Sequence, residues 1–277
     1  MGRRVNRFST KEYLESAALP SYSTGRYAVI SHKEIMDMSS GLLNHYGLNV
    51  EHELFKCNSK ADVAQGIYHI KDLSDPEMGM IFAWVNSYDK SKRFQCCIGG
   101  VLTMNHNYFV ADMGSWTRKH TGNAKQEAFD QMKDQISNAA GYYLKILQDK
   151  AAMKLVIVPL KQRAEILGRL LFQDRILTME QGSVVKSQLI APGAVDYNAP
   201  QDSLWTFYNQ MAVALKKSHP RDWLDDQKKL HAYLVLEFGI GQPAPVTQVI
   251  TQLDLIDSTT EVEAEKNNKE PEISFEL

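Results

Sequence analysis

The pattern of apolar and polar residues divides this chain into two parts with different predicted structures. Residues 50–120 carry short runs rich in aromatic and β-branched residues, separated by turn sequences such as Asp75-Pro76 and the stretch 87–91. This pattern predicts three or four consecutive antiparallel strands, and the two strands joined at residues 87–91 form the clearest hairpin. Asp89 in that turn is interpreted first as a turn former and only second as a catalytic carboxylate.

The apolar spacing becomes helical from Lys125 onward. Phe129, Met132, Ile136 and Tyr143 form one stripe, which we expect to pack on the sheet. Capping sequences and prolines predict further helix starts, as does the pair Ser31 and Glu34 near the N-terminus. These starts lie at Pro159, at Thr178 with Gln181, at Asp202 or Ser203, and after Pro220.

The order of these elements predicts an α+β fold: an N-terminal helix, an antiparallel β-meander and a mainly helical C-terminal half. Strands and helices do not alternate, which disfavours a parallel, doubly wound sheet. We expect a flexible arm over residues 1–25, one mixed globular domain over 26–240, and a linker with a disordered acidic tail over 241–277.

Composition favours a cytoplasmic protein. Hydrophobic residues make up 44% of the 277 residues, and no run approaches the roughly 20 apolar residues that a membrane helix needs. The polar N-terminus lacks the apolar core of a signal peptide. The three cysteines have no CxxC spacing, which disfavours both a disulfide framework and a thiolate zinc site. We therefore expect no membrane partner.

The charge is distributed unevenly along the chain. Residues 254–277 hold eight acidic residues and two lysines, so the remaining 253 residues carry a net charge of +4. The tail ends with Ile273, Phe275 and Leu277 among acidic residues, and it resembles the partner-docking tails of phage and bacterial single-strand-binding proteins. A disordered, solubilising end is an equally supported interpretation.

Sequence motifs for catalysis are absent. The chain has no P-loop, GxGxxG, GxSxG or HExxH sequence, and its eight histidines are scattered without ligand spacing. We therefore expect no catalytic residues, no metal and no cofactor. Two carboxylates distant in sequence can still meet in a fold, so a dispersed enzymatic site stays open.

Basic and aromatic residues gather at two places in the predicted meander, one at a hairpin turn and one at the end of its last strand. Such residues neutralise phosphates and stack on unpaired bases. Because alternate turns of a meander share an edge, we expect one nucleic-acid surface from both groups. A basic helical series, including Arg163 and Arg169, is a candidate groove wall. The alternative for all these charges is an ordinary solvated surface, and the alternative for Trp116 is a position in the core. The two meander groups are Tyr88, Lys90, Lys92 and Arg93, and Trp116, Arg118, Lys119 and His120.

Several sequence stretches resemble a known phage and plasmid family. They are NSYDKS at 86–91, DMGSWTRKHTG at 112–122, RAEILGRLLF at 163–172, LWTFYN at 204–209 and SHPRDW at 218–223. In this order they resemble the phage/plasmid-like family named domain of unknown function 932, particularly its Bacteroidota-phage type, across roughly residues 50–240. The resemblance implies a role in replication and recombination. The element order is also similar to that of single-strand annealing proteins, a comparison of folds alone.

These observations together favour a protein that binds or anneals single-stranded DNA without ATP. We expect it to be a homo-oligomer whose tail docks phage replication or recombination proteins, in the host cytoplasm. Two alternatives remain open: a structural or virion-packaged phage protein, and a hydrolase or nucleotide-modifying enzyme with a dispersed site.

Overall fold

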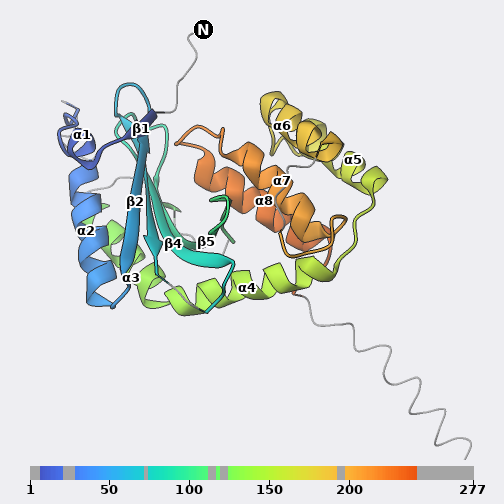
Figure 1. Ribbon diagram of the computed structural model, residues 1–277. Helices are drawn as coiled ribbons and strands as arrows, with labels where there is room; N and C mark the ends of the chain where they lie inside the picture. The colour runs from blue at the N-terminus through green and yellow to red at the C-terminus, as the bar shows by residue number, and fades with distance from the viewer. Residues whose placement is uncertain are drawn as a thin grey trace, which may run out of the picture. The chain divides into compact units, whose positions relative to one another are not determined.

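The computed structural model describes residues 7–20, 29–71, 74–111, 117–118, 124–191 and 197–241. Residues up to Ile240 belong to one compact unit. A helical N-terminal segment, an antiparallel sheet and a helical half follow one another (Figure 1), so the α+β prediction is confirmed. The rest of the predicted linker and tail, with Ile273, Phe275 and Leu277, lies outside the described residues.

The sheet is an antiparallel meander. Its order is β1-β2-β3-β4-β5-β6, and β7 pairs with β5 beside this path. In the β2–β3 hairpin, His52 lies opposite His69 and Lys56 lies opposite Gln65. The strands are β1 (Arg7–Ser9), β2 (Val50–Cys57), β3 (Val63–Ile70), β4 (Met78–Ser87), β5 (Phe94–Leu102), β6 (Tyr108–Phe109) and β7 (Thr117–Arg118).

Helices pack on both faces of the sheet. Trp84 and Cys96 belong to the larger apolar cluster, which includes residues of α2, α3 and α4. Cys97 points to the opposite face and packs in a second cluster with Trp223 of α8. Adjacent cysteines on opposite faces follow from the alternation of side chains along a strand. The helices are α1 (Lys11–Glu15), α2 (His32–His45), α3 (Ala124–Ser137), α4 (Ala139–Leu155), α5 (Leu160–Gly168), the π-helix η1 (Arg169–Gln173), α6 (Met179–Ile190), α7 (Leu204–Leu215) and α8 (Trp223–Glu237).

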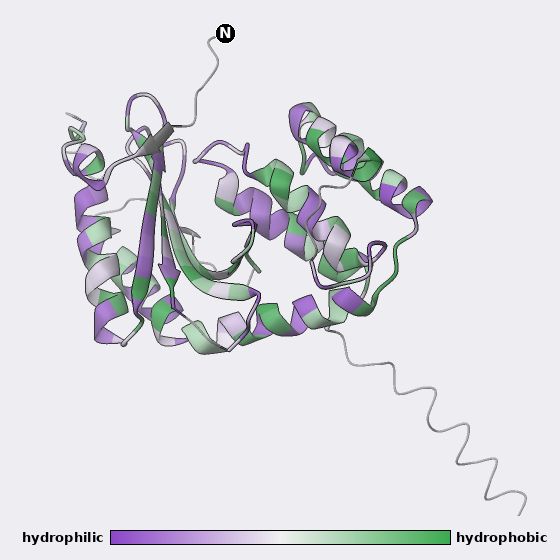
Figure 2. Ribbon diagram, viewed as in Figure 1, coloured by the Kyte–Doolittle hydropathy of each residue, from purple (hydrophilic) through white to green (hydrophobic). Residues whose placement is uncertain are grey.

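The strands differ in their exposure to solvent. All residues of β5 are buried, as are nearly all residues of β3 and β4, whereas β2 begins with four exposed residues. Figure 2 shows hydrophilic and hydrophobic residues along β2. Strands buried on both faces are apolar almost throughout, and a half-exposed strand alternates. One face of β2 is therefore available to line a pocket.

The predicted helical stripe packs on the sheet as expected. Met132, Ile136 and Tyr143 are buried and Phe129 is partly buried. The stripe spans two helices, α3 and α4, because the helix is interrupted at Asn138. The amide of Asn138 donates a hydrogen bond to the carbonyl oxygen of Asp134 over 2.9 Å, a local contact that competes with regular helix geometry.

Local capping sequences start the helices where they were predicted. Reciprocal capping boxes form between Ser31 and Glu34 at α2, and between Thr178 and Gln181 at α6. Ser203 caps α7 through a hydrogen bond from the backbone N–H of Thr206. These caps satisfy N–H groups that have no partner within the helix, and this is why short sequence patterns locate helix starts.

The N-terminal segment differs from the flexible arm predicted for residues 1–25. Within it, β1 extends the sheet beside β2, and α1 follows at once. Thr10 caps α1 by accepting a hydrogen bond from the N–H of Tyr13 over 3.2 Å, and Leu14 is buried in the core. A strand pairing, a helix cap and a buried leucine therefore connect this mostly polar segment to the rest of the fold. None of the described helices is both long and apolar enough to cross a membrane.

Candidate anion-binding pocket

The basic turn between β4 and β5 is only partly exposed. Lys90 and Arg93 are exposed, and Lys90 has a positive φ of 62°. The ammonium of Lys92 is paired with the carboxylate of Asp225 on α8. The carboxylate of Asp89 accepts a hydrogen bond from the backbone N–H of Ser91 over 2.9 Å, as expected for a turn former. Two of the three predicted cations at this turn therefore face solvent.

Tyr88 is a structural residue and offers no exposed ring for stacking. Its side chain is buried, its hydroxyl accepts a hydrogen bond from the N–H of His32 over 2.7 Å, and its ring stacks on the His32 ring at 4.0 Å. Burial raises the pKa of Tyr88 to about 12. Tyr88 therefore holds the start of α2 against the end of β4.

The second predicted group lies mostly outside the described residues, which include neither Trp116, Lys119 nor His120. The backbone of Arg118 is described, and it pairs with Phe94, the residue after Arg93. This pairing brings the two predicted groups close along the backbone, although they are far apart in sequence.

The basic helical series mostly makes contacts within the chain. Arg163 is buried and donates hydrogen bonds to the carbonyl oxygens of Val158 and Gln201. Arg169 forms a two-bond ion pair with Glu237. Arg163 therefore holds α5 to segments outside the helices, and Arg169 holds η1 to α8. Their part in a groove wall stays a prediction.

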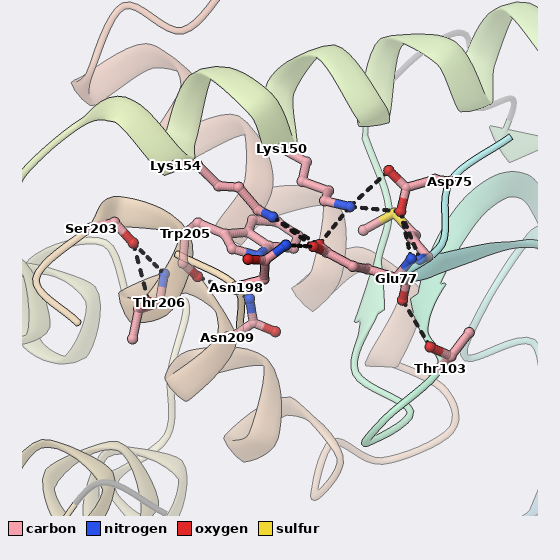
Figure 3. Close-up of polar contacts among 11 residues, drawn as sticks. Asp75, Glu77, Thr103, Lys150, Lys154, Asn198, Ser203, Trp205, Thr206 and Asn209 are labelled. Atoms are coloured by element: carbon pink, nitrogen blue, oxygen red, sulfur yellow. Dashed lines mark hydrogen bonds and ion pairs between the residues drawn. The ribbon is translucent and has the colours of Figure 1, made fainter. Parts of the chain in front are cut away.

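Two further lysines of this series hold α4 to the start of β4 (Figure 3). The ammonium of Lys150 lies 2.7 Å from the carboxylate of Asp75 and 2.8 Å from that of Glu77, which also pairs with Lys154. Burial opposes the ionised form of Glu77, but hydrogen bonds from Lys150, Lys154 and Asn198 outweigh it and lower the pKa of Glu77 to about 2. We call these five residues the ion-pair network.

A pocket of about 620 Å³ opens beside β2, at residues that sequence patterns did not single out. Its volume is within the usual range for sites that hold a small ligand. Residues from β2, β3, β6, the β5–β6 turn and the end of α7 contribute to it. We call it the basic pocket, and its lining is His52, Glu53, Leu54, Lys56, His69, Asn105, His106, Tyr108 and Lys216.

Two lysines of the basic pocket are held partly out of solvent. Burial lowers the pKa of Lys56. Burial also lowers the pKa of Lys216, and the positive charge of Lys56 lowers it further. The ammonium of Lys216 donates a hydrogen bond to the carbonyl oxygen of Asn105 over 2.6 Å. Burial disfavours the charged form of both side chains, and a nearby anion would favour it.

Three histidines also line the basic pocket. The ring of His69 lies 6.3 Å from the ring of His52 and 6.0 Å from that of His106. Its Nε2 atom is 3.2 Å from the hydroxyl oxygen of Tyr108. Burial, followed by the two neighbouring histidines, lowers the pKa of His69 to about 4, so this ring is neutral at pH 7.

Acidic residues contribute little to the basic pocket. Within its described lining, Glu53 is the one acidic side chain, and its carboxylate lies 3.5 Å from the ammonium of Lys11. Leu54 and Tyr108 supply apolar surface. This combination of cations, imidazoles and an apolar wall suits an anion that carries an organic group.

The described residues do not hold a metal site. Among them, no three His, Cys, Asp or Glu side chains are grouped so as to bind a metal ion. The linked side chains of Asp149, His231 and Tyr208 are buried among the helices, with His231 bonded to the other two over 3.2 Å each. Their burial indicates a structural hydrogen-bond chain.

One part of the basic pocket had a signal in the sequence. The β2–β3 hairpin turns at residues 60 and 61, and this register places His52 opposite His69. The turn residues indicate where the hairpin is centred, so this pairing could have been predicted. His106 and Lys216 carry no comparable signal, because tertiary packing alone brings them to β2.

In comparisons with known proteins, no family model, curated protein or solved structure matches this chain. The resemblance to domain of unknown function 932 therefore stays a prediction.

Proposed function

We propose that this protein binds single-stranded nucleic acid, without ATP, and that the basic pocket is the point of strongest contact. The observation that supports this function best is the convergence of Lys56, Lys216 and three histidines on one pocket whose described lining holds a single acidic residue. Phosphate neutralisation by lysine supplies most of the affinity of sequence-independent nucleic-acid binding.

The electrostatics of the basic pocket favour an anionic ligand. Charged groups that are partly buried lose hydration, which the lowered pKa values of Lys56 and Lys216 reflect. A phosphate between the two ammonium groups would replace that hydration with charge-assisted hydrogen bonds. Leu54 and Tyr108 offer apolar surface to a sugar or base beside the phosphate.

The exposed cations of the β4–β5 turn are proposed as weaker contacts. Lys90 and Arg93 are accessible, but Asp89 shares their turn and Asp225 neutralises the neighbouring Lys92. Exposed charges of mixed sign contribute little to binding at physiological salt. The turn would therefore guide the strand, and the basic pocket would hold it.

An equilibrium titration of labelled oligothymidylate, followed by fluorescence anisotropy, tests this function. The wild-type protein is compared with the double variant Lys56→Gln/Lys216→Gln and with a matched control, Lys133→Gln/Lys186→Gln, which changes two exposed lysines on α3 and α6. We expect the pocket variant to bind about tenfold or more weakly, a loss of about 1.4 kcal/mol, and the control to bind as wild type does. Absence of binding by the wild-type protein, or equal losses in both variants, would refute the proposal.

A further inference from the structure

A second, smaller pocket lies at the tip of the β2–β3 hairpin. Its volume is about 200 Å³, below the roughly 300–1,000 Å³ of pockets that hold drug-sized ligands, so it suits a smaller group such as one nucleobase. The β2–β3 turn, the β4–β5 turn and the segment before α8 form it. We call it the turn pocket, and its lining includes Asn58, Lys60, Asp62, Asp89, His219 and Arg221.

The turn pocket and the basic pocket follow one another along the same two segments. Lys56, near the end of β2, lines the basic pocket, and Asn58, two residues later, lines the turn pocket. Two residues of a strand span about 7 Å, and their side chains share a face. On the other wall, Lys216 lines the basic pocket and His219 lines the turn pocket. A strand held in the basic pocket therefore has its next nucleotide within reach of the turn pocket.

The start of α8 holds the two pockets together. Trp223 follows Arg221 by two residues and is buried, and its ring meets the ring of Tyr108 edge-on at 5.5 Å. Tyr108 lines the basic pocket. One aromatic contact thus connects the wall of the basic pocket with the segment that carries Arg221 into the turn pocket.

The turn pocket supplies hydrogen-bond acceptors that the basic pocket mostly lacks. The carboxylate of Asp62 accepts a hydrogen bond from the side-chain amide of Asn58, and that of Asp89 accepts one from the backbone N–H of Ser91. A carboxylate has two oxygens with several lone pairs, so both groups keep acceptor capacity. Two carboxylates also disfavour a phosphate at this position.

The turn pocket supplies donors as well. The guanidinium of Arg221 donates through Nε and Nη2 to the carboxylate of Asp222 over 2.9 and 2.8 Å, and a guanidinium has further N–H groups besides these. Lys60 is exposed at the turn. A small pocket with strong donors and strong acceptors matches the edge of a nucleobase.

Guanine fits this combination better than the other bases. Its O6 and N7 atoms accept hydrogen bonds from arginine or lysine, the commonest specific contact to a base. Its N1–H and amino groups donate side by side, which suits a carboxylate. Thymine has one N–H donor, and adenine and cytosine have an amino group beside an acceptor nitrogen. These edges are accessible in unpaired bases.

We propose, resting on the proposed function, that the turn pocket receives a guanine of the single strand whose phosphate occupies the basic pocket. A carboxylate of Asp62 or Asp89 accepts from the N1–H and amino groups, and Arg221 or Lys60 donates to O6 and N7. The basic pocket supplies affinity for any strand, and the turn pocket adds a preference for one base.

The test compares four strands of one length in anisotropy titrations: oligothymidylate, and the same strand with one central guanine, adenine or cytosine. We expect the guanine strand to bind wild-type protein about tenfold more tightly than the others, the effect of one bidentate base contact. Preference for another base, or equal affinity of all four strands, overturns guanine recognition and retains strand binding.

A pair of variants locates the preference. Asp62→Asn/Asp89→Asn keeps an acceptor oxygen for each turn and removes both carboxylates. Asp37→Asn/Asp130→Asn changes the net charge equally at exposed positions on α2 and α3. The guanine preference should vanish in the first variant, with oligothymidylate still bound, and persist in the second. A preference that survives in both, or is lost in both, overturns the turn pocket as its origin. Thermal melts that match wild type show that both variants are folded.

Failure of the proposed function gives a different result, because then no strand binds. Calorimetric titrations of the wild-type protein with deoxyguanosine 5′-phosphate and thymidine 5′-phosphate then test the turn pocket alone. Tighter binding of the guanine nucleotide retains the base site and overturns strand binding. Equal binding of the two nucleotides, or binding of neither, overturns both proposals.

Discussion

Two pairs of lysines in this protein lie largely out of solvent and have opposite surroundings. Lys150 and Lys154 in the ion-pair network meet the carboxylates of Asp75 and Glu77. Lys56 and Lys216 line a pocket whose described lining holds one carboxylate, that of Glu53, which lies near Lys11. The comparison teaches that sheltered lysines stabilise a fold where carboxylates surround them, and that a lining with few carboxylates distinguishes the pocket that we propose as a binding site.

The largest effect that we expect comes from breaking the ion-pair network. Lys150→Met leaves Asp75 and Glu77 without the ammonium between them, and should lower the free energy of unfolding by about 3 kcal/mol. Urea denaturation measures this loss, with the exposed Lys133→Met as control. The folded variant should bind strands as wild type does. A loss below about 0.5 kcal/mol would mean that the network behaves like exposed ion pairs.

The acid stability of the protein should depend on Glu77. Its pKa in the folded protein is about 2, below its usual value of 4.5, so its stabilising contribution is complete above pH 4.5 and disappears as the pH falls toward 2. Glu77→Gln should remove about 2 kcal/mol at pH 7, allowing for partial solvent screening. Between pH 4.5 and 2 the stabilities of variant and wild type should converge. If the stability difference between Glu77→Gln and wild type were the same at every pH, the ion-pair network would not be the origin of the low pKa of Glu77.

The smallest effect should come from the exposed β4–β5 turn. Lys90→Gln/Arg93→Gln removes two accessible cations, and screening by salt limits their contribution to about a threefold change in strand affinity. Anisotropy titrations of this variant and of Lys56→Gln/Lys216→Gln show which of the two surfaces contributes more to strand affinity. If the turn variant loses more affinity than the pocket variant, the strand contacts the sheet edge predicted from sequence, and the basic pocket has another ligand.

Features that depend on neighbouring residues could be predicted from the sequence. The capping boxes at Ser31 and Thr178, the turn role of Asp89 and the apolar stripe at Met132 and Ile136 all reflect contacts over a few positions. Alternation along strands likewise placed Cys96 and Cys97 on opposite faces. Each of these features is set by local geometry, and this is why the sequence was enough to predict the α+β order of elements.

The candidate site could not be predicted in the same way. Lys216 follows α7, and His106 belongs to the β5–β6 turn, so more than 100 residues separate two side chains that line one pocket. The sequence also gave no indication that Lys92 would meet Asp225, or that Arg169 would meet Glu237. Whether a cation is neutralised depends on tertiary packing, so charge patterns alone could not show that Lys92 and Arg169 are paired within the chain.

The salt dependence of strand binding tests most directly whether Lys56 and Lys216 contact phosphates. Each lysine contact to a single strand contributes about 0.7 to the slope of log affinity against log salt concentration. Lys56→Gln/Lys216→Gln should therefore flatten that slope by about 1.4 relative to wild type, while Lys133→Gln/Lys186→Gln leaves it unchanged. An unchanged slope in the pocket variant, in a protein that melts as wild type does, would contradict the assignment of the basic pocket as the phosphate-binding site.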